Sequence, residues 1–174
     1  MTIVISNRQR TKKINLRLLK QITGALLAEL KINGAELGIN LVAASEMALI
    51  NKTFLKHEGP TDVITFDYGD VAALVKARKE TLKKTSAFAS AATNLSGELL
   101  VCVDEAIVHA KEFKTSWQSE IVRYVAHGIL HLRGHDDRRV AARRKMKREE
   151  NRLLRGVSKK FSLAQIGGGS KLRA

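Results

Sequence analysis

Two histidines four residues apart lie in the most constrained stretch of this 174-residue chain. A largely apolar run, Ile121–Ala126, leads into His127, and His131 follows. If this stretch is helical, residues four apart lie one above the other on the same face. Both imidazoles then point the same way, which is the spacing of a helical pair of metal ligands. The chain is therefore predicted to fold around a helix that is anchored in the core and presents two histidines on one side.

A glycine turn follows the histidine pair. Gly134 can end the helix, because glycine tolerates positive φ. The next three residues, His135, Asp136 and Asp137, can each swing back to supply a third ligand. Three protein ligands with a fourth position left to water are typical of a catalytic zinc site. Position 128 is glycine, so the glutamate base that metalloproteases carry after their first histidine is missing. The pattern indicates a metal site and argues against peptide hydrolysis.

The run from His127 to Asp137 reads H-G-I-L-H-L-R-G-H-D-D and resembles the signature of the YbeY family, H-G-x-L-H-L-x-G-Y-D-H. The resemblance implies a metal-dependent endoribonuclease of ribosomal RNA maturation. The family's third histidine ligand falls on Asp137, and its tyrosine falls on His135. Carboxylate oxygens also bind zinc. We therefore expect one zinc ion on His127, His131 and Asp137, with the same residues serving catalysis and His135 as the alternative third ligand.

A second segment extends the resemblance, which covers about residues 36–150. Pro60–Phe66 is similar to the family's P-T-D-V-L-S-F segment, which implies that it lines the cleft opposite the histidine helix. Asn51 matches a family asparagine, whereas Leu55 stands where the family has an arginine linked to RNA processing. A leucine cannot bind phosphate, so Lys56 or a basic residue of the C-terminal half is the expected replacement.

Basic residues are concentrated after the histidine stretch. The formal net charge is +14, and residues 133–174 contribute +10 of it, from 14 Lys or Arg and four acids. Such a cluster attracts polyanions, because neutralising phosphates releases condensed counterions. RNA or DNA is the natural candidate, and the family resemblance implies RNA; the alternative is a solvated basic helix and tail that serve only solubility. The candidate RNA-binding residues are Lys56, Arg133, Arg138 and Arg139.

The apolar patterns predict an α/β (α+β) fold, a single domain with a small mixed β-sheet packed with helices and the metal site on a central helix and the following turn. The expected strands are 2–6, 37–43, 59–66 and 95–103, and the expected helices are 16–31, 46–55, 74–84, 105–113, a histidine helix from 117, and 139–155. Ser45, Asp104 and Ser116 are the expected N-caps. The hydrolase-like domain is expected over 1–160, with a flexible basic tail over 161–174.

Composition also bears on the compartment. The chain has a single cysteine, Cys102, which excludes an internal disulfide. No apolar run is long enough to span a bilayer, and the first residues do not follow the pattern of a secretory signal. We expect a cytoplasmic protein without a membrane partner.

Three functions fit these observations. The first is a metal-dependent endoribonuclease that prefers single strands and acts in ribosomal RNA processing and ribosome maturation. Its partners would be ribosomal RNA precursors, together with ribosomal proteins or the small ribosomal subunit. The second is a non-catalytic RNA-binding ribosome assembly factor with a structural metal. The third is a metal-dependent hydrolase of another substrate. A His131→Ala variant that loses RNA cleavage but keeps RNA binding would single out the first.

Overall fold

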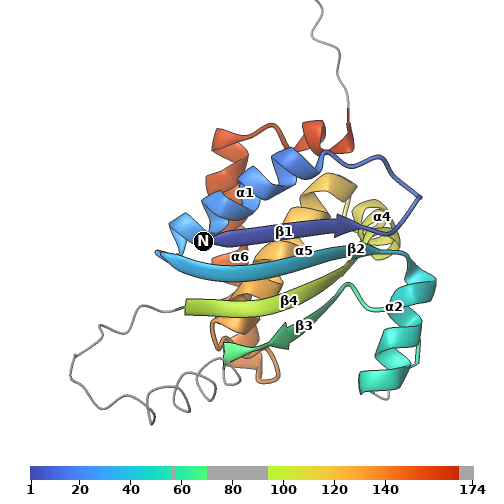
Figure 1. The fold of residues 1–174 in the computed structure, drawn as a ribbon, viewed down its shortest axis with the longest axis horizontal. Coiled ribbons are helices and arrows are strands. Elements are labelled where there is room, and N and C mark those ends of the chain that lie inside the picture. Colours follow the sequence, from blue (N-terminus) through green and yellow to red (C-terminus); the bar gives the residue numbers. More distant parts are fainter. Residues whose placement is uncertain (56–57, 70–93, 169–174) are drawn as a thin grey trace, which may run out of the picture.

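The computed structural model describes residues 1–55, 58–69 and 94–168, and the described part is a four-stranded sheet with helices packed on it (Figure 1). In chain order its elements are β1 (Thr2–Asn7), α1 (Leu16–Glu29), β2 (Gly34–Val42), α2 (Ala44–Ile50), a π-helical turn (Asn51–Leu55), β3 (Val63–Asp67), β4 (Asn94–Cys102), α4 (Val103–Glu112), α5 (Trp117–Leu132), α6 (Val140–Lys160) and a 3₁₀ helix (Leu163–Gly167). The strand order is β1-β2-β4-β3, with β3 antiparallel to β4 and the other pairs parallel. The predicted mixed sheet and α/β class are confirmed.

The helices α1, α5 and α6 lie together on one face of the sheet (Figure 1). Alternate residues of β2 and β4, such as Ile39 and Leu99, are buried in the core between these layers, because successive side chains of a strand point to opposite faces. Their neighbours in sequence point the other way, and a smaller apolar cluster forms there around Met47 of α2 and Cys102. The sheet is thus packed on both faces, and more extensively on the side of α5.

Helix α5 is the centre of the fold, because it contacts α1, α4, α6, β3 and β4. Its fully buried apolar residues are Ile121, Val122, Val125, Ala126, Ile129 and Leu130. Gly128 lets this helix lie close to the sheet, since a Cβ at that position would be 2.6 Å from Cδ2 of Leu99. Burying each leucine or isoleucine contributes roughly 1.5–3 kcal/mol. The helix that carries the two histidines is therefore held firmly in place.

One of the three predicted N-caps is confirmed and two are wrong. Ser116 caps α5, since its hydroxyl accepts the N–H of Ser119 at 3.2 Å. Ser45 does not cap α2, because the helix begins at Ala44, two residues before the Glu46 start that such a cap requires, and Ala43 is its N-cap. The N–H of Ala44 donates instead to the carboxylate of Asp104 at 2.7 Å. Asp104 lies inside the first turn of α4 and joins α4 to α2 rather than capping its own helix.

The C-terminal segment is folded further along the chain than its sequence indicates. Helix α6 continues to Lys160, and the 3₁₀ helix follows. Ile166 in that short helix is fully buried in the main core. The packed part of the chain thus extends beyond residue 160, where a flexible tail is expected from sequence. The predicted helix over 74–84 lies outside the described residues.

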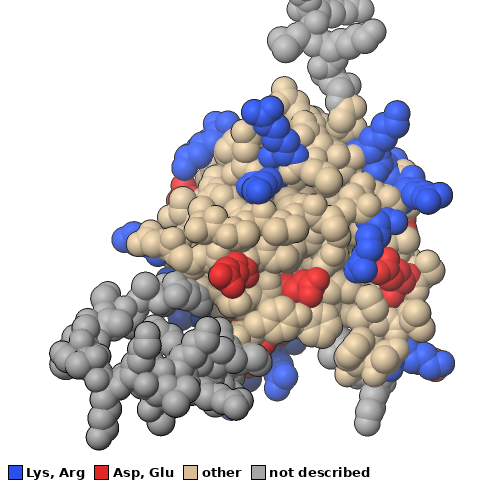
Figure 2. Space-filling view, in the orientation of Figure 1, with Lys and Arg blue, Asp and Glu red and all other residues tan. Residues whose placement is uncertain are grey.

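Charge is distributed unevenly over the surface. Figure 2 views the sheet face opposite α1, α5 and α6, which is mostly uncharged and carries isolated acidic side chains, with Lys and Arg toward its edges. Helix α6, which holds many of the basic residues, lies behind that face (Figure 1). Among the helices that the structure describes, none combines the length and the apolar composition needed to cross a bilayer.

Candidate metal centre

The two histidines of α5 face each other, one helical turn apart. Their Nε2 atoms are 2.9 Å apart, and their ring centroids are 4.5 Å apart. The apolar side of α5 is buried against the sheet, so the histidine side, with both rings partly exposed, is held in a fixed orientation. The helical pair that the sequence predicts is present.

The other ring nitrogens have acceptor partners that orient both imidazoles. Nδ1 of His127 lies 2.6 Å from the carboxylate of Glu150 on α6, and Nδ1 of His131 lies 3.0 Å from the carbonyl oxygen of His135. Carboxylate and carbonyl oxygens accept hydrogen bonds, so each Nδ1–H donates, and in the neutral ring each Nε2 keeps its lone pair. Two lone pairs at this distance need a proton or a metal ion between them. Acceptors behind the ring are also the usual support of histidine ligands in metal sites.

The glycine turn brings Asp137 to the same place. Gly134 has a φ of 84°, in the left-handed region that favours glycine. Its N–H donates to the carbonyl of His131 at 2.8 Å, so the chain reverses directly after α5. Oδ2 of Asp137 then lies 3.9 Å from Nε2 of His127 and 3.8 Å from Nε2 of His131. Arg143 of α6 holds this turn, since its Nε donates to the carbonyl of Asp137 at 3.0 Å.

The three side chains form a group that could hold a metal ion. One ligand atom from each of His127, His131 and Asp137 lies within 4.8 Å of the other two. Two imidazole nitrogens and one carboxylate oxygen suit zinc, and they also suit other divalent ions. The three side chains remain 22%, 29% and 40% exposed, so water can reach one side of the group. The donor set and the open side therefore fit a catalytic metal.

The charges around the cluster favour a cationic partner. Burial lowers the pKa of His127, but the hydrogen bond and charge of Glu150, with the charges of Asp62 and Asp137, outweigh it and raise that pKa above its ordinary value. Glu150 is buried, with 8% exposure, and its second oxygen lies 3.8 Å from the guanidinium of Arg123. The same negative groups that favour a protonated imidazole also favour a divalent ion.

A cavity of about 450 Å³ adjoins the cluster. Its wall includes His127, Asp137 and Asp62, so the segment that resembles the family's P-T-D motif faces the same space as the histidine helix. Two basic residues of α6, Arg143 and Lys147, line it as well. The cavity therefore combines a possible metal position with cations suited to a phosphate.

Sequence reasoning missed Glu150, Arg143 and Lys147. A signal for Glu150 exists, because this acid recurs with Met146, Leu153 and Val157 at helical spacing on the buried side of α6. An acid on the apolar face of a strongly basic helix needs a buried partner. Nothing in the sequence identifies that partner as His127.

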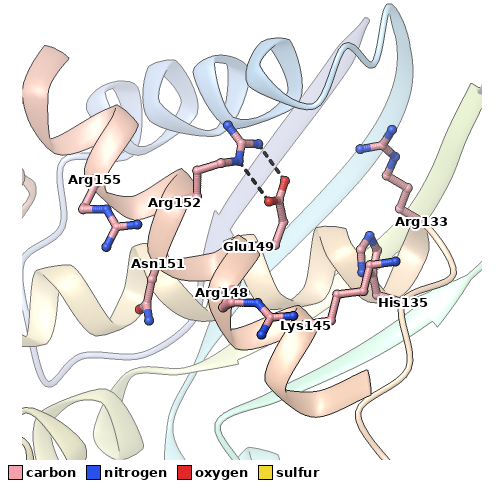
Figure 3. Close-up of a pocket in the computed structure, with 8 residues that line it drawn as sticks. All are labelled: Arg133, His135, Lys145, Arg148, Glu149, Asn151, Arg152 and Arg155. Carbon is pink, nitrogen blue, oxygen red and sulfur yellow. Dashed lines mark hydrogen bonds and ion pairs between the residues drawn. The ribbon is translucent and has the colours of Figure 1, made fainter. Parts of the chain in front are cut away.

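The other candidate residues lie in different places. His135 is outside the cluster, and its ring faces a groove on the other side of α6 together with Arg133 (Figure 3). Burial and the nearby charges of Lys145 and Arg133 lower the pKa of His135 below its ordinary value. Arg138 and Arg139 are exposed on the turn before α6. Lys56 lies outside the described residues.

In comparisons with known proteins, the matching family model and the similar sequences named below share one description. A family model described as endoribonuclease YbeY matches residues 4–158. Endoribonuclease YbeY of Finegoldia magna is 31% identical over 90% of this chain and 94% of its own length, and that of Chlorobium phaeovibrioides is 30% identical over 95% and 100%. A longer relative with the same name, from Myxococcus xanthus, is 32% identical over 79% of this chain, which spans 42% of that protein. A solution structure of a Thermotoga maritima protein shares the fold, with a TM-score of 0.59, 20% identity and coverage of 99% of this chain and 100% of that one.

Proposed function

Because the chain belongs to the YbeY family of endoribonucleases, we propose that it is a metal-dependent endoribonuclease with one zinc ion on His127, His131 and Asp137. The observation that carries this proposal is the convergence of two imidazole nitrogens and a carboxylate oxygen beside a cavity with basic walls. This group stands at the end of α5, in the part of the chain that the family model matches.

A divalent ion bound there would supply a water of lowered pKa and would polarise a phosphoryl oxygen. Other residues of the chain orient the ligands and would bind the substrate. Glu150 orients His127, and the hydrogen bond from Arg143 fixes the turn that carries Asp137. Arg143 and Lys147 line the cavity, where their charges favour a phosphate group over a neutral substrate.

The proposed substrate is RNA, with a preference for single strands. The proposed role is the processing of ribosomal RNA precursors in the cytoplasm, with ribosomal proteins or the small subunit as further partners. RNA as the substrate is supported by the relatives, which are endoribonucleases, and by the net charge of +14, which favours a polyanion. A surface of that charge binds phosphate backbones without reading base sequence.

The test is metal analysis together with RNA cleavage. Purified protein should contain close to one zinc per chain, and His131→Ala and Asp137→Ala should each lose the metal and the cleavage of a single-stranded RNA. His135→Ala is the matched control, because its ring lies outside the cluster while its backbone carbonyl, which holds His131, is unchanged. Loss of metal in this control and retention in Asp137→Ala would overturn the proposed ligand set.

A second candidate is a non-catalytic RNA-binding assembly factor. It is favoured by Leu55, where the family has an arginine, and by an aspartate at the family's third histidine position. RNA binding by the intact protein without cleavage under zinc, manganese or magnesium would support this candidate. Peptide hydrolysis is disfavoured further, since Gly128 packs against Leu99 and leaves no room for a glutamate base.

A further inference from the structure

A groove of about 750 Å³ lies on the side of α6 away from the metal cluster (Figure 3). One wall is the turn after α5, with Arg133 and His135, and the other is the exposed side of α6. The α6 residues of the groove are Lys145, Arg148, Glu149, Asn151, Arg152 and Arg155. None of the four cations that α6 contributes is among the residues singled out from the sequence.

The groove cations on α6 form a row. Lys145, Arg148, Arg152 and Arg155 recur every three or four residues, which places them along one side of the helix. With a rise of about 1.5 Å per residue, the row is about 15 Å long. A stacked nucleic-acid strand advances about 3.4 Å per nucleotide. The row therefore matches the length of about four nucleotides.

The charge of the groove is poorly neutralised by the protein. Its wall has five cations and one acid, Glu149. Glu149 is already engaged by Arg152 through two hydrogen bonds of 2.9 and 2.6 Å, and Arg152 also reaches Glu29 at 3.6 Å. Within the described residues, Arg152 is the groove cation that takes part in ion pairs. With respect to the described part of the chain, the remaining cations are available to an external anion.

The groove adjoins the cavity beside the metal cluster at one shared residue. Asn151 lines both the groove and the cavity beside the cluster. The consecutive acids of α6 have different partners, since Glu149 lines the groove and Glu150 contacts His127. The carbonyl of His135 also supports His131, while its ring lines the groove. A polymer can thus reach the metal site and the groove at once by crossing α6.

We propose that this groove is a second RNA-binding site, which holds the phosphate backbone of the substrate a few nucleotides away from the bond to be cut. The inference rests on the proposed function for its choice of RNA among polyanions. Lysine and arginine side chains bind the backbone in any sequence, because the phosphates are the same in every nucleotide. The site therefore contributes affinity and register, and the metal centre contributes cleavage.

The test compares two double variants that remove the same charges. Lys145→Gln/Arg148→Gln acts in the groove. Arg17→Gln/Lys20→Gln is the control, because these residues are also exposed on a helix but lie near the other end of α1 from Glu29, which pairs with Arg152 of the groove. Glutamine preserves helix propensity in all four positions. Binding of a labelled twelve-nucleotide uridine RNA is measured by anisotropy with a chelator present, so that cleavage does not interfere.

For a single-stranded nucleic acid, the slope of log binding constant against log salt concentration decreases in magnitude by about 0.7 for each phosphate contact removed. Two contacts should lower that slope by about 1.4, which is about a 25-fold loss of affinity at 0.1 M salt. The control double variant should keep the salt slope of the intact protein, and its RNA affinity should differ from that of the intact protein by no more than about twofold. Equal RNA affinity in the two double variants, or no RNA binding by the intact protein, would overturn the proposal that the groove binds RNA. An acidic protein segment would then be the polyanion that suits its charge.

Cleavage separates this inference from the proposed function. With metal and saturating RNA, the groove variant should cleave at the rate of the intact protein and should show a raised KM. If the groove variant loses affinity while even the intact protein cleaves nothing, the second RNA site stands and the proposed hydrolysis fails. If the intact protein and the groove variant cleave RNA equally well and bind it with equal affinity, the proposed hydrolysis stands and the proposed RNA-binding role of the groove is refuted.

Discussion

Glu150 provides a sharp test of how the metal centre is supported. Its carboxylate is buried and lies 2.6 Å from Nδ1 of His127, so it orients the ring and makes Nε2 a better donor to a metal. Glu150→Gln keeps the size of the side chain and removes its charge. Loss of such a supporting group weakens metal binding about 10- to 100-fold. This corresponds to about 1.4 to 2.8 kcal/mol of metal-binding free energy.

The assay is competition for zinc against a chromogenic chelator, at a pH where the intact protein is fully loaded. Glu149→Gln is the matched control, since the neighbouring residue loses the same charge but pairs with Arg152 in the groove. The control should keep the zinc affinity of the intact protein. If Glu150→Gln also binds zinc as tightly as the intact protein, while His131→Ala does not, then Glu150 is only a structural partner of Arg123 and the reasoning is refuted.

Three further predictions concern stability and reactivity. Gly128→Ala should destabilise the fold by about 1–3 kcal/mol in urea unfolding, because its Cβ would be 2.6 Å from Cδ2 of Leu99, and an unchanged midpoint would contradict this packing. Ile166→Ala should lower the free energy of unfolding by about 2–5 kcal/mol, since the side chain is fully buried in the core; a loss under 0.5 kcal/mol would mean that the 3₁₀ helix is not docked. Burial raises the pKa of the Cys102 thiol to about 11. At pH 8 a thiol reagent should therefore label the native protein at least 100-fold more slowly than the urea-unfolded chain, and comparable rates would show that this thiol is accessible.

Much of the fold could be predicted from sequence because its signals are local. The alternation in β1 and β2, the helical period of α1 and the caps of α5 each depend on residues a few positions apart. The errors concern contacts between distant segments. Asp104 resembles a cap for its own helix, but its carboxylate accepts the N–H of Ala44, 60 residues earlier in the chain. A cap with a partner in another element has no local pattern.

The same division applies to the metal centre. The spacing of His127 and His131 determines by itself that the two rings share a helix face, and Gly134 determines that the chain turns directly after them, because both effects act within one or two helical turns. Only the tertiary structure decided that Asp137 returns to the pair while His135 points into a groove, since that choice depends on how α6 docks and on its hydrogen bond from Arg143. Docking also brought Glu150 to His127 across 23 residues. Side chains that far apart in sequence meet only when the burial of apolar surface brings their helices together.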